Sequence, residues 1–123
     1  MRSSVVSSYS VRIEGLDKFR RAIRRGSERA RSEARRALNA TVIVAEGEIK
    51  SATPVRTGRL RSSITHEVRD LTGVVGTNVY YAPYVEFGTV KMAPRRMFAV
   101  GIERAWPRIQ QIWREAMARL WRR

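Results

Sequence analysis

The residues that could carry out catalysis are few in this chain and widely separated. His66 is the only histidine and there is no cysteine, so a transition-metal site and a thiol nucleophile both lack their usual ligands. Ser62 and Ser63 have no base and acid at a spacing that would mark a catalytic triad. On a strand face shared with Ile64 and Val68, His66 is expected to pack rather than react.

Carboxylates and glycines give no stronger support for a reaction. Glu46 and Glu48 are two positions apart in a predicted helix and therefore point to different faces. Gly73, Gly76 and Gly88 are not followed by the helix and the Lys-Ser or Lys-Thr pair of a phosphate-binding loop. We therefore predict that the protein is not an enzyme and needs no cofactor or metal.

Length and hydrophobic content bound the architecture. With 123 residues, 43% of them hydrophobic, the chain can form a modest core, and we expect a single domain over 1–123. Apolar runs such as 42–45 are far shorter than the roughly 20 residues that span a bilayer. Residues 1–10 lack the apolar core of an export signal. We expect a soluble protein that folds in a reducing cytoplasm and has no membrane partner.

The strongest compositional signal is positive charge. Lysine and arginine total 25 against 11 aspartate and glutamate, which gives a formal net charge of +14. Only Lys18, Lys50 and Lys91 are lysines, so arginine, which pairs well with carboxylates and phosphates, carries most of this charge. The charge indicates contact with DNA or with an acidic protein surface. The preference for arginine over lysine is equally explained by the codon bias of a source genome.

The hydrophobic pattern predicts a strand and then a long helix in the first half of the chain. Tyr9, Val11 and Ile13 alternate with polar residues, which is typical of a half-buried strand, here an edge strand. Over about 16–50, apolar residues recur every three or four positions, as on one face of a helix. Alanines in this stripe permit close approach of a neighbouring element. A gap at Gly26-Ser27 predicts a kink or a break between two helices.

The second half of the chain predicts a small sheet followed by another helix. Residues 62–69 and 74–80 alternate and would pair across a short turn, with Gly76 at a bulge or a close contact. After 94–96 a helical pattern continues to the end, and Pro107 either kinks this helix or begins another. The predicted fold is α+β, with a long N-terminal helix and a C-terminal helix packed on a small, mostly antiparallel sheet.

Two segments stand out for their composition. Residues 53–64 place basic side chains at Arg56, Arg59 and Arg61 in an expected irregular loop that either contacts phosphate or docks on a neighbouring protein. Residues 75–89 contain three tyrosines, a phenylalanine and one carboxylate close together. Tyrosine combines apolar area with a polar tip, so this segment is either an interface or ordinary packing of a small core.

Three motifs in a fixed order resemble a known phage family. They are Pro-Val-x-Thr-Gly-x-Leu-(Arg)-x-Ser-Ile at 54–64, Gly-Thr-x-x-x-Tyr-Ala-x-Tyr-x-Glu-x-Gly-Thr at 76–89, and Pro-x-x-(Met/Phe)-Phe at 94–98. Together, over about 10–120, they resemble the siphophage head–tail joining family, also called neck or tail-completion proteins. The resemblance implies a protein without a catalytic site that assembles as a ring, commonly a hexamer, coaxial with the portal, so that head and tail can join.

The resemblance also implies which residues and partners matter. Residues that would shape the sheet, its loops and the interfaces are Pro54, Thr57, Gly58, Leu60, Tyr81, Tyr84, Glu86, Gly88 and Thr89. The loop around Thr57-Gly58 is expected to be extended and at an interface, and a bulky residue at Gly88 harms folding if that position holds a positive backbone angle. The tryptophans of the last helix are candidates for a surface that a ring would cover.

The implied partners are copies of the chain and the neighbouring connector, stopper, tail terminator or tail-tube proteins. The expected location is the neck or tail of the virion, after assembly in the host cytoplasm. An alternative function is a basic accessory protein that binds DNA through its arginine-rich helix. Contacts to packaged DNA or acidic partners would come from Arg20, Arg24, Arg56, Arg59 and Arg61. The chain shows no helix-turn-helix reader with its short turn.

Overall fold

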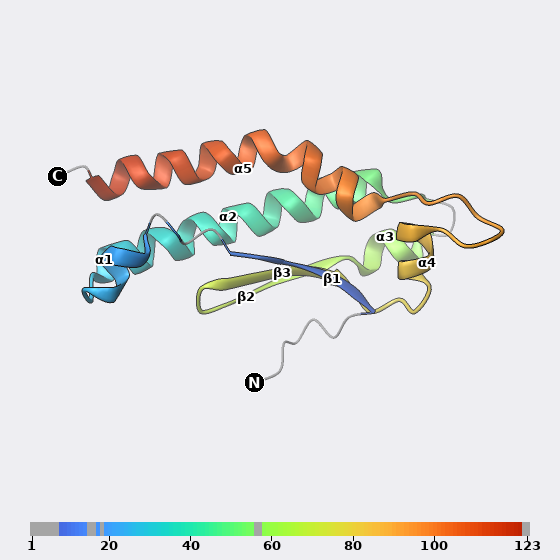
Figure 1. Cartoon of the computed structure of the whole chain (residues 1–123), viewed down its shortest axis with the longest axis horizontal. Coiled ribbons are helices and arrows are strands. Elements are labelled where there is room, and N and C mark those ends of the chain that lie inside the picture. The colour runs from blue at the N-terminus through green and yellow to red at the C-terminus, as the bar shows by residue number, and fades with distance from the viewer. Residues whose placement is uncertain (1–7, 15–16, 18, 56–57, 122–123) are drawn as a thin grey trace.

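Two long helices lie antiparallel to each other over a three-stranded sheet in the computed structural model (Figure 1). The structure describes residues 8–14, 17, 19–55 and 58–121. Its elements in chain order are β1 (Tyr9–Ile13), α1 (Arg20–Arg24), α2 (Glu28–Ala52), α3 (Arg59–Ser63), β2 (Thr65–Arg69), β3 (Thr72–Thr77), α4 (Ala82–Phe87) and α5 (Met97–Trp121). This is the predicted α+β fold, with α2 and α5 packed together and on the antiparallel sheet.

The break predicted in the long helix separates α1 from α2. Gly26 has a φ of +84°, a left-handed conformation that glycine adopts without strain. Ser27 is the N-cap of α2, since its hydroxyl accepts a hydrogen bond from the backbone N–H of Ala30 at 3.1 Å. The predicted start near residue 16 lies outside the described residues, and the described helix begins at Arg20.

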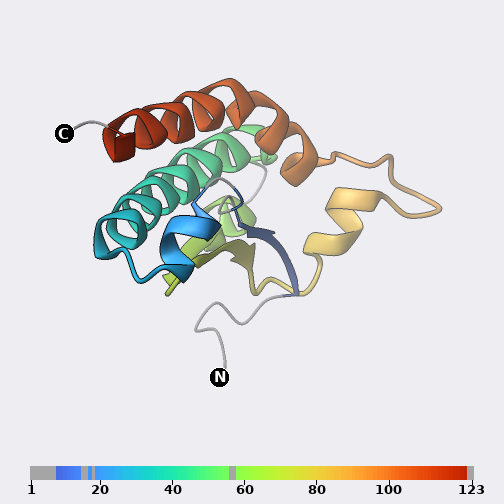
Figure 2. The same ribbon diagram turned by 60° about the vertical axis from the view of Figure 1, so that its left-hand side comes forward.

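Small residues bring α2 and α5 so close that their backbones are in contact. A Cβ placed on Gly101 of α5 would lie 2.7 Å from the backbone nitrogen of Ile49 on α2, which is closer than real atoms pack. Buried alanines continue along both helices: Ala30, Ala34, Ala37 and Ala45 on α2, and Ala105 and Ala116 on α5. Pro107 lies inside α5, so the chain forms one continuous helix there. Figure 2 shows α5 covering one side of α2 while the sheet lies on the other.

The central strand of the sheet is β3, which pairs antiparallel with β1 on one side and β2 on the other. This order confirms β1 as an edge strand, with Tyr9, Val11 and Ile13 half-buried and the residues between them exposed. Gly76 on β3 lies opposite Ser10 of β1, and a Cβ at this glycine would be 2.7 Å from the Ser10 Cβ. The close contact predicted at Gly76 is therefore present.

The segment expected to be an irregular loop contains a short helix, α3. Gly58 has a φ of +73°, and its carbonyl accepts a hydrogen bond from the Ser62 N–H at 3.0 Å, which closes a helical turn that the sequence pattern did not reveal. The hydroxyl of Ser63 donates to the Leu60 carbonyl. Because this helix occupies residues up to 63, β2 begins at Thr65 and not at residue 62 as predicted.

Two further boundaries differ from the prediction. The strand expected over 74–80 is β3 at 72–77, so the turn before it is confined to Asp70 and Leu71, and Asp70 takes a positive φ of 51° there. Residues 82–87, which were expected to shape the sheet and its loops, form the helix α4. Pro83 explains this outcome, because proline fits the first turn of a helix, where its missing N–H has no partner to lose.

The core has two parts along α2. Around its C-terminal half, buried side chains from the helices and sheet are Val42, Ala45, Ile49, Leu60, Ile64, Val75, Val79, Ala82, Met97 and Phe98. Around its N-terminal half they are Phe19, Ala30, Ala34, Ala37, Ile112 and Ala116. Among the described residues, no helix combines the length and apolar character that crossing a bilayer requires.

Candidate interaction surfaces

The three sequence motifs gather at one end of the molecule, where α3, α4 and the start of α5 lie (Figure 1). Large hydrophobic side chains are exposed on these segments: Val55, Tyr80, Tyr84, Phe87, Val90 and Met92. Val90 stands at the tip of a turn closed by Thr89 and Met92, and it is completely exposed. We call these six exposed residues the motif end. They form an apolar and aromatic surface that the isolated subunit leaves open to solvent.

An open cavity of about 420 Å³ lies at the motif end, between α3 and α4. It is lined by Pro54, Arg59, Leu60, Tyr81, Val85, Met92 and Arg95. The lining is mostly apolar, with two arginines, so it suits an apolar side chain that has a carboxylate nearby. Three predicted motif residues, Pro54, Leu60 and Tyr81, meet in this cavity. Met92 and Arg95 were not singled out, because only the path of the turn after α4 brings them there.

Gly88 and Thr89 fix the turn that carries Val90. Gly88 has a φ of +79°, and a Cβ at this position would lie 2.7 Å from the carbonyl oxygen of Met92 and 2.8 Å from the nitrogen of Pro94. The positive backbone angle considered for Gly88 is therefore present, and the space beside it is already filled. The N–H of Thr89 donates to the carbonyl of Met92 at 2.8 Å, which closes the turn.

Glu86 has a role inside the fold. Its side chain is buried, and the two carboxylate oxygens accept hydrogen bonds from the backbone N–H groups of Phe98 at 2.8 Å and Ala99 at 3.2 Å. These N–H groups belong to the first turn of α5, where they have no partner within the helix. Glu86 therefore caps α5 from α4. The sequence contained a signal for this role. No Ser, Thr, Asp or Asn precedes the helix within 94–96, so the cap of this helix had to come from elsewhere in the chain.

Aromatic contacts join the motif end to the edge strand. The ring of Tyr9 on β1 meets Phe98 edge to face, with centroids 4.8 Å apart, and Phe87 at 5.5 Å. Burial raises the pKa of the Tyr9 hydroxyl, and the negative charge of Glu86 raises it further, while Arg96 acts in the opposite direction. The neutral phenol is therefore the favoured form beside the capping carboxylate.

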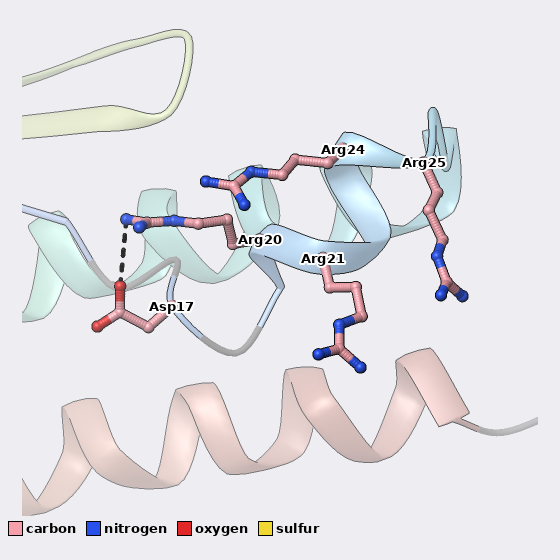
Figure 3. A pocket seen from close by; sticks show the side chains of 5 residues that line it. All are labelled: Asp17, Arg20, Arg21, Arg24 and Arg25. Atoms are coloured by element: carbon pink, nitrogen blue, oxygen red, sulfur yellow. Dashed lines mark ion pairs between the residues drawn. The ribbon is translucent and has the colours of Figure 1, made fainter.

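The five arginines proposed as DNA or acidic-partner contacts do not form one surface. Arg20 and Arg24 are exposed on α1, next to Arg21 and Arg25 (Figure 3). Arg59 and Arg61 are on α3, at the opposite end of the molecule, where Arg59 lines the motif-end cavity and Arg61 is half-buried. Two predicted residues, Arg56 and Thr57, lie outside the described residues.

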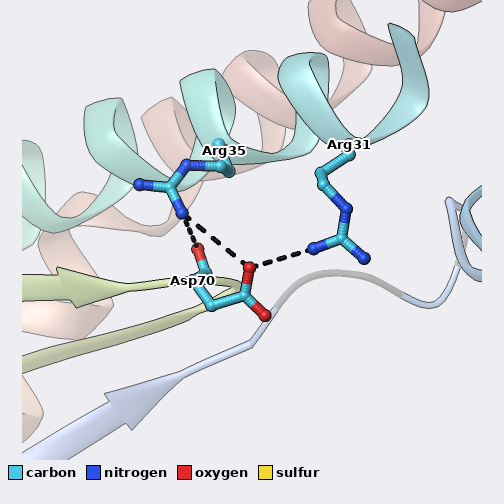
Figure 4. A network of polar contacts seen from close by, with 3 residues as sticks. All are labelled: Arg31, Arg35 and Asp70. Carbon is cyan, nitrogen blue, oxygen red and sulfur yellow. Dashed lines mark hydrogen bonds and ion pairs between the residues drawn. The ribbon is translucent and has the colours of Figure 1, made fainter. Parts of the chain in front are cut away.

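Arginines of α2 that face the sheet hold its turn. Asp70 lies at the β2–β3 turn, and its carboxylate pairs with Arg31 at 2.9 Å and with Arg35 at 3.9 Å (Figure 4). Arg35 also donates to the Asp70 carbonyl at 3.0 Å. Part of the basic face expected on the long helix is thus used to hold the β2–β3 turn.

The single histidine has a different setting from the packed one predicted. His66 is exposed, and its Nδ1 pairs with the carboxylate of Glu46 on α2, which also binds Lys50 at 3.1 Å. Burial alone would raise the pKa of Glu46, but hydrogen bonds from His66 and Lys50 lower it overall. The hydrogen bond between His66 and Glu46 therefore joins strand β2 to helix α2. The alternation pattern could not predict it, because that pattern does not show which residue of another element faces the strand.

A second aromatic cavity lies along α5, away from the motif end. It has a volume of about 380 Å³ and is lined by Ile13, Glu14, Asp17, Phe19, Trp106, Ile109, Gln110, Trp113 and Arg114. Trp106 is half exposed, whereas Trp113 packs on Phe19 and donates its indole N–H to Thr41 at 2.9 Å. We call this the Trp106 cavity. The charged residues among its described lining are two carboxylates and one arginine, in contrast to the two arginines of the motif-end cavity.

Comparison with known proteins gives one match. Residues 17–88, more than half of the chain, match the family described as "Bacteriophage HK97-gp10, putative tail-component". The matched range includes the first motif, the second motif up to Gly88, and the helix that precedes them. No curated protein and no solved structure matches the chain. Within the described residues, no group of three histidine or acidic side chains is placed to hold a metal ion.

Proposed function

The chain belongs to the HK97-gp10-like family of bacteriophage tail components, and we propose that it is a structural protein that assembles with its own copies into a ring at the joint between head and tail. In this role it catalyses no reaction and needs no cofactor. It would act in the virion neck or tail, where the implied partners are connector, stopper, tail terminator or tail-tube proteins. The observation that supports assembly best is the exposed motif end.

The motif end has the composition and rigidity of an interface. Tyrosine, phenylalanine and methionine are enriched in protein interfaces, and a soluble monomer rarely leaves so many of them exposed together. The capping bonds of Glu86 and the turn at Gly88 hold this surface in one conformation before any partner arrives. A preformed surface loses little conformational entropy when it binds.

A ring repeats one contact between two different surfaces of the subunit until the circle closes. The Trp106 cavity supplies a second surface that complements the motif end. The cavity at the motif end is mostly apolar with arginines at Arg59 and Arg95, whereas the Trp106 cavity is aromatic with carboxylates at Glu14 and Asp17. We propose that Val90 and its neighbours on one copy dock at the Trp106 cavity of the next. The single domain proposed over 1–123 would be the repeating unit.

Paired variants test this arrangement. Val90→Asp disables the motif end and Trp106→Asp disables the cavity, and both sites are exposed, so the fold should survive. Each variant alone is expected to stay monomeric in sedimentation velocity, while the wild type forms closed rings visible by electron microscopy. An equimolar mixture of the two variants retains one intact contact, so it should form dimers and no larger species.

A control variant comes from another exposed hydrophobic residue. Ile43 lies on α2, outside the motif end and the Trp106 cavity, and Ile43→Asp should assemble like the wild type. The head-to-tail arrangement is wrong if the mixture of Val90→Asp and Trp106→Asp stays monomeric. The function itself is wrong if the wild type is monomeric at all concentrations and antibodies against it fail to label the neck or tail of purified virions.

A further inference from the structure

Four arginines of α1 and its C-cap form a second, chemically different surface, which we call the arginine cluster: Arg20, Arg21, Arg24 and Arg25. We infer that this cluster binds the phosphodiester backbone of duplex DNA. The inference goes beyond ring formation and does not depend on it. It rests on the gathering of four exposed arginines around one cavity, of which only Arg20 has an ion pair among the described residues.

The cluster surrounds a shallow, open cavity of about 400 Å³, and the other described residue that lines it is Asp17. Figure 3 shows the side chains spreading from α1, with Arg20 and Arg24 on one side and Arg21 and Arg25 on the other. Asp17 pairs with Arg20 at 3.3 Å, and both side chains are mostly exposed, so the pair is weak. Within the part of the chain that the structure describes, the other three arginines have no ion pair.

Several arginines outside the cluster have carboxylate partners in the fold. Arg31 and Arg35 are held by Asp70, and Arg119 donates to Glu33 at 2.8 Å. In contrast, α1 places like charges four residues apart, an arrangement that destabilises a helix by repulsion. Packing does not require it either, since these arginines are all exposed while Phe19 and Ile23 anchor the segment. Positive charge that costs stability and has no internal partner indicates an external anion.

The composition of the surface favours DNA over an acidic protein. Protein interfaces contain an apolar or aromatic centre with charge at the rim, but every described residue that lines this cavity is charged. Phosphate contacts need no such centre, because arginine binds phosphate oxygens through charge and paired hydrogen bonds. Binding of this kind positions a protein on DNA without reading its sequence, and it weakens steeply with added salt, because the counterions released on binding then gain less entropy.

The test compares two variants of the full chain that lose the same charge at the same spacing. Arg21→Gln/Arg25→Gln removes half of the cluster and leaves the Asp17–Arg20 pair intact. Arg104→Gln/Arg108→Gln removes two exposed arginines, also four residues apart, from α5. Fluorescence anisotropy with a labelled 20-base-pair duplex measures Kd at several salt concentrations. Circular dichroism checks folding, and sedimentation records whether each variant still assembles, so that loss of DNA binding is separated from loss of the ring.

The cluster variant is expected to bind at least about fivefold more weakly, with the slope of log K against log salt reduced by about two, since each lost phosphate contact lowers it by about one. The α5 variant should change affinity less than about twofold. Equal losses in both variants would show that net charge alone attracts DNA and would overturn the inference. So would absence of wild-type binding at low salt, or poly-glutamate displacing the duplex as effectively as unlabelled DNA does.

Discussion

The carboxylate of Glu86 on α4 accepts the backbone N–H of Phe98 at 2.8 Å, so one helix supplies the N-terminal cap of another. This contact joins α4, with its exposed Tyr84 and Phe87, to the long helix α5. It also explains why a carboxylate occurs in the middle of an aromatic motif. The Glu86 side chain is buried, and its oxygens accept hydrogen bonds from backbone N–H groups instead of facing the solvent.

Replacing Glu86 with alanine should lower the free energy of unfolding by about 1–3 kcal/mol, because two N–H groups at the start of α5 lose their acceptor. Urea unfolding followed by circular dichroism measures the loss. Glu103→Ala, on the exposed face of α5, is the control and should change stability by less than about 0.5 kcal/mol. A Glu86 variant as stable as the control would contradict the capping role.

Gly88 and Gly47 should respond in opposite directions to alanine. Gly88→Ala forces a Cβ against the Met92 carbonyl at a positive φ, so it should destabilise the fold by more than about 1 kcal/mol. Gly47 lies exposed on α2 with open space around its Cβ position, so Gly47→Ala should stabilise by about 0.5–1 kcal/mol. Thermal unfolding distinguishes the two, and a Gly88→Ala protein with an unchanged Tm would refute this account of the turn.

The Glu46–His66 contact predicts a pH-dependent contribution to stability. Because the folded state lowers the pKa of Glu46 below its usual 4.5, its stabilising effect is present above that value and is lost as pH falls through the folded pKa. Glu46→Gln should therefore destabilise the protein at pH 6 and have a smaller effect at pH 3. Urea titrations at both pH values give the comparison, with Glu48→Gln as the control. An equal loss at both values would exclude the charged interaction.

Reversing charge across the proposed ring contact should be repaired by a second reversal. Arg95→Glu at the motif-end cavity is expected to weaken self-association about tenfold, because it places a carboxylate opposite Glu14 and Asp17 of the next copy. Adding Glu14→Arg to the same chain should restore part of that loss. Sedimentation equilibrium measures the self-association constant of each variant. If the double variant self-associates more weakly than Arg95→Glu alone, these two surfaces do not meet.

Much of the fold followed from hydrophobic spacing. The edge strand at Tyr9–Ile13, the break at Gly26-Ser27 and the C-terminal helix each depend on local periodicity or on a residue with a fixed backbone preference. The two short helices were missed for a related reason. α3 and α4 span five and six residues, which is too short for a 3.6-residue period to emerge from the sequence.

The surfaces were harder to predict than the fold. Motif spacing marked Pro54, Leu60 and Tyr81, and the structure brings these three together. Motif spacing alone could not show that the Glu86 side chain is buried, because this depends on where α5 begins relative to α4. Composition also could not show which arginines have carboxylate partners, since this depends on where the fold places residues such as Asp70 and Glu33.

Where Gly101 meets Ile49, no side chain separates the two long helices, so one helix cannot slide past the other there without a clash between their backbones. Helices α2 and α5 therefore form a rigid unit of fixed length, with the motif end near one extremity and α1 near the other (Figure 1). Whatever binds at the two extremities is therefore kept at a constant separation.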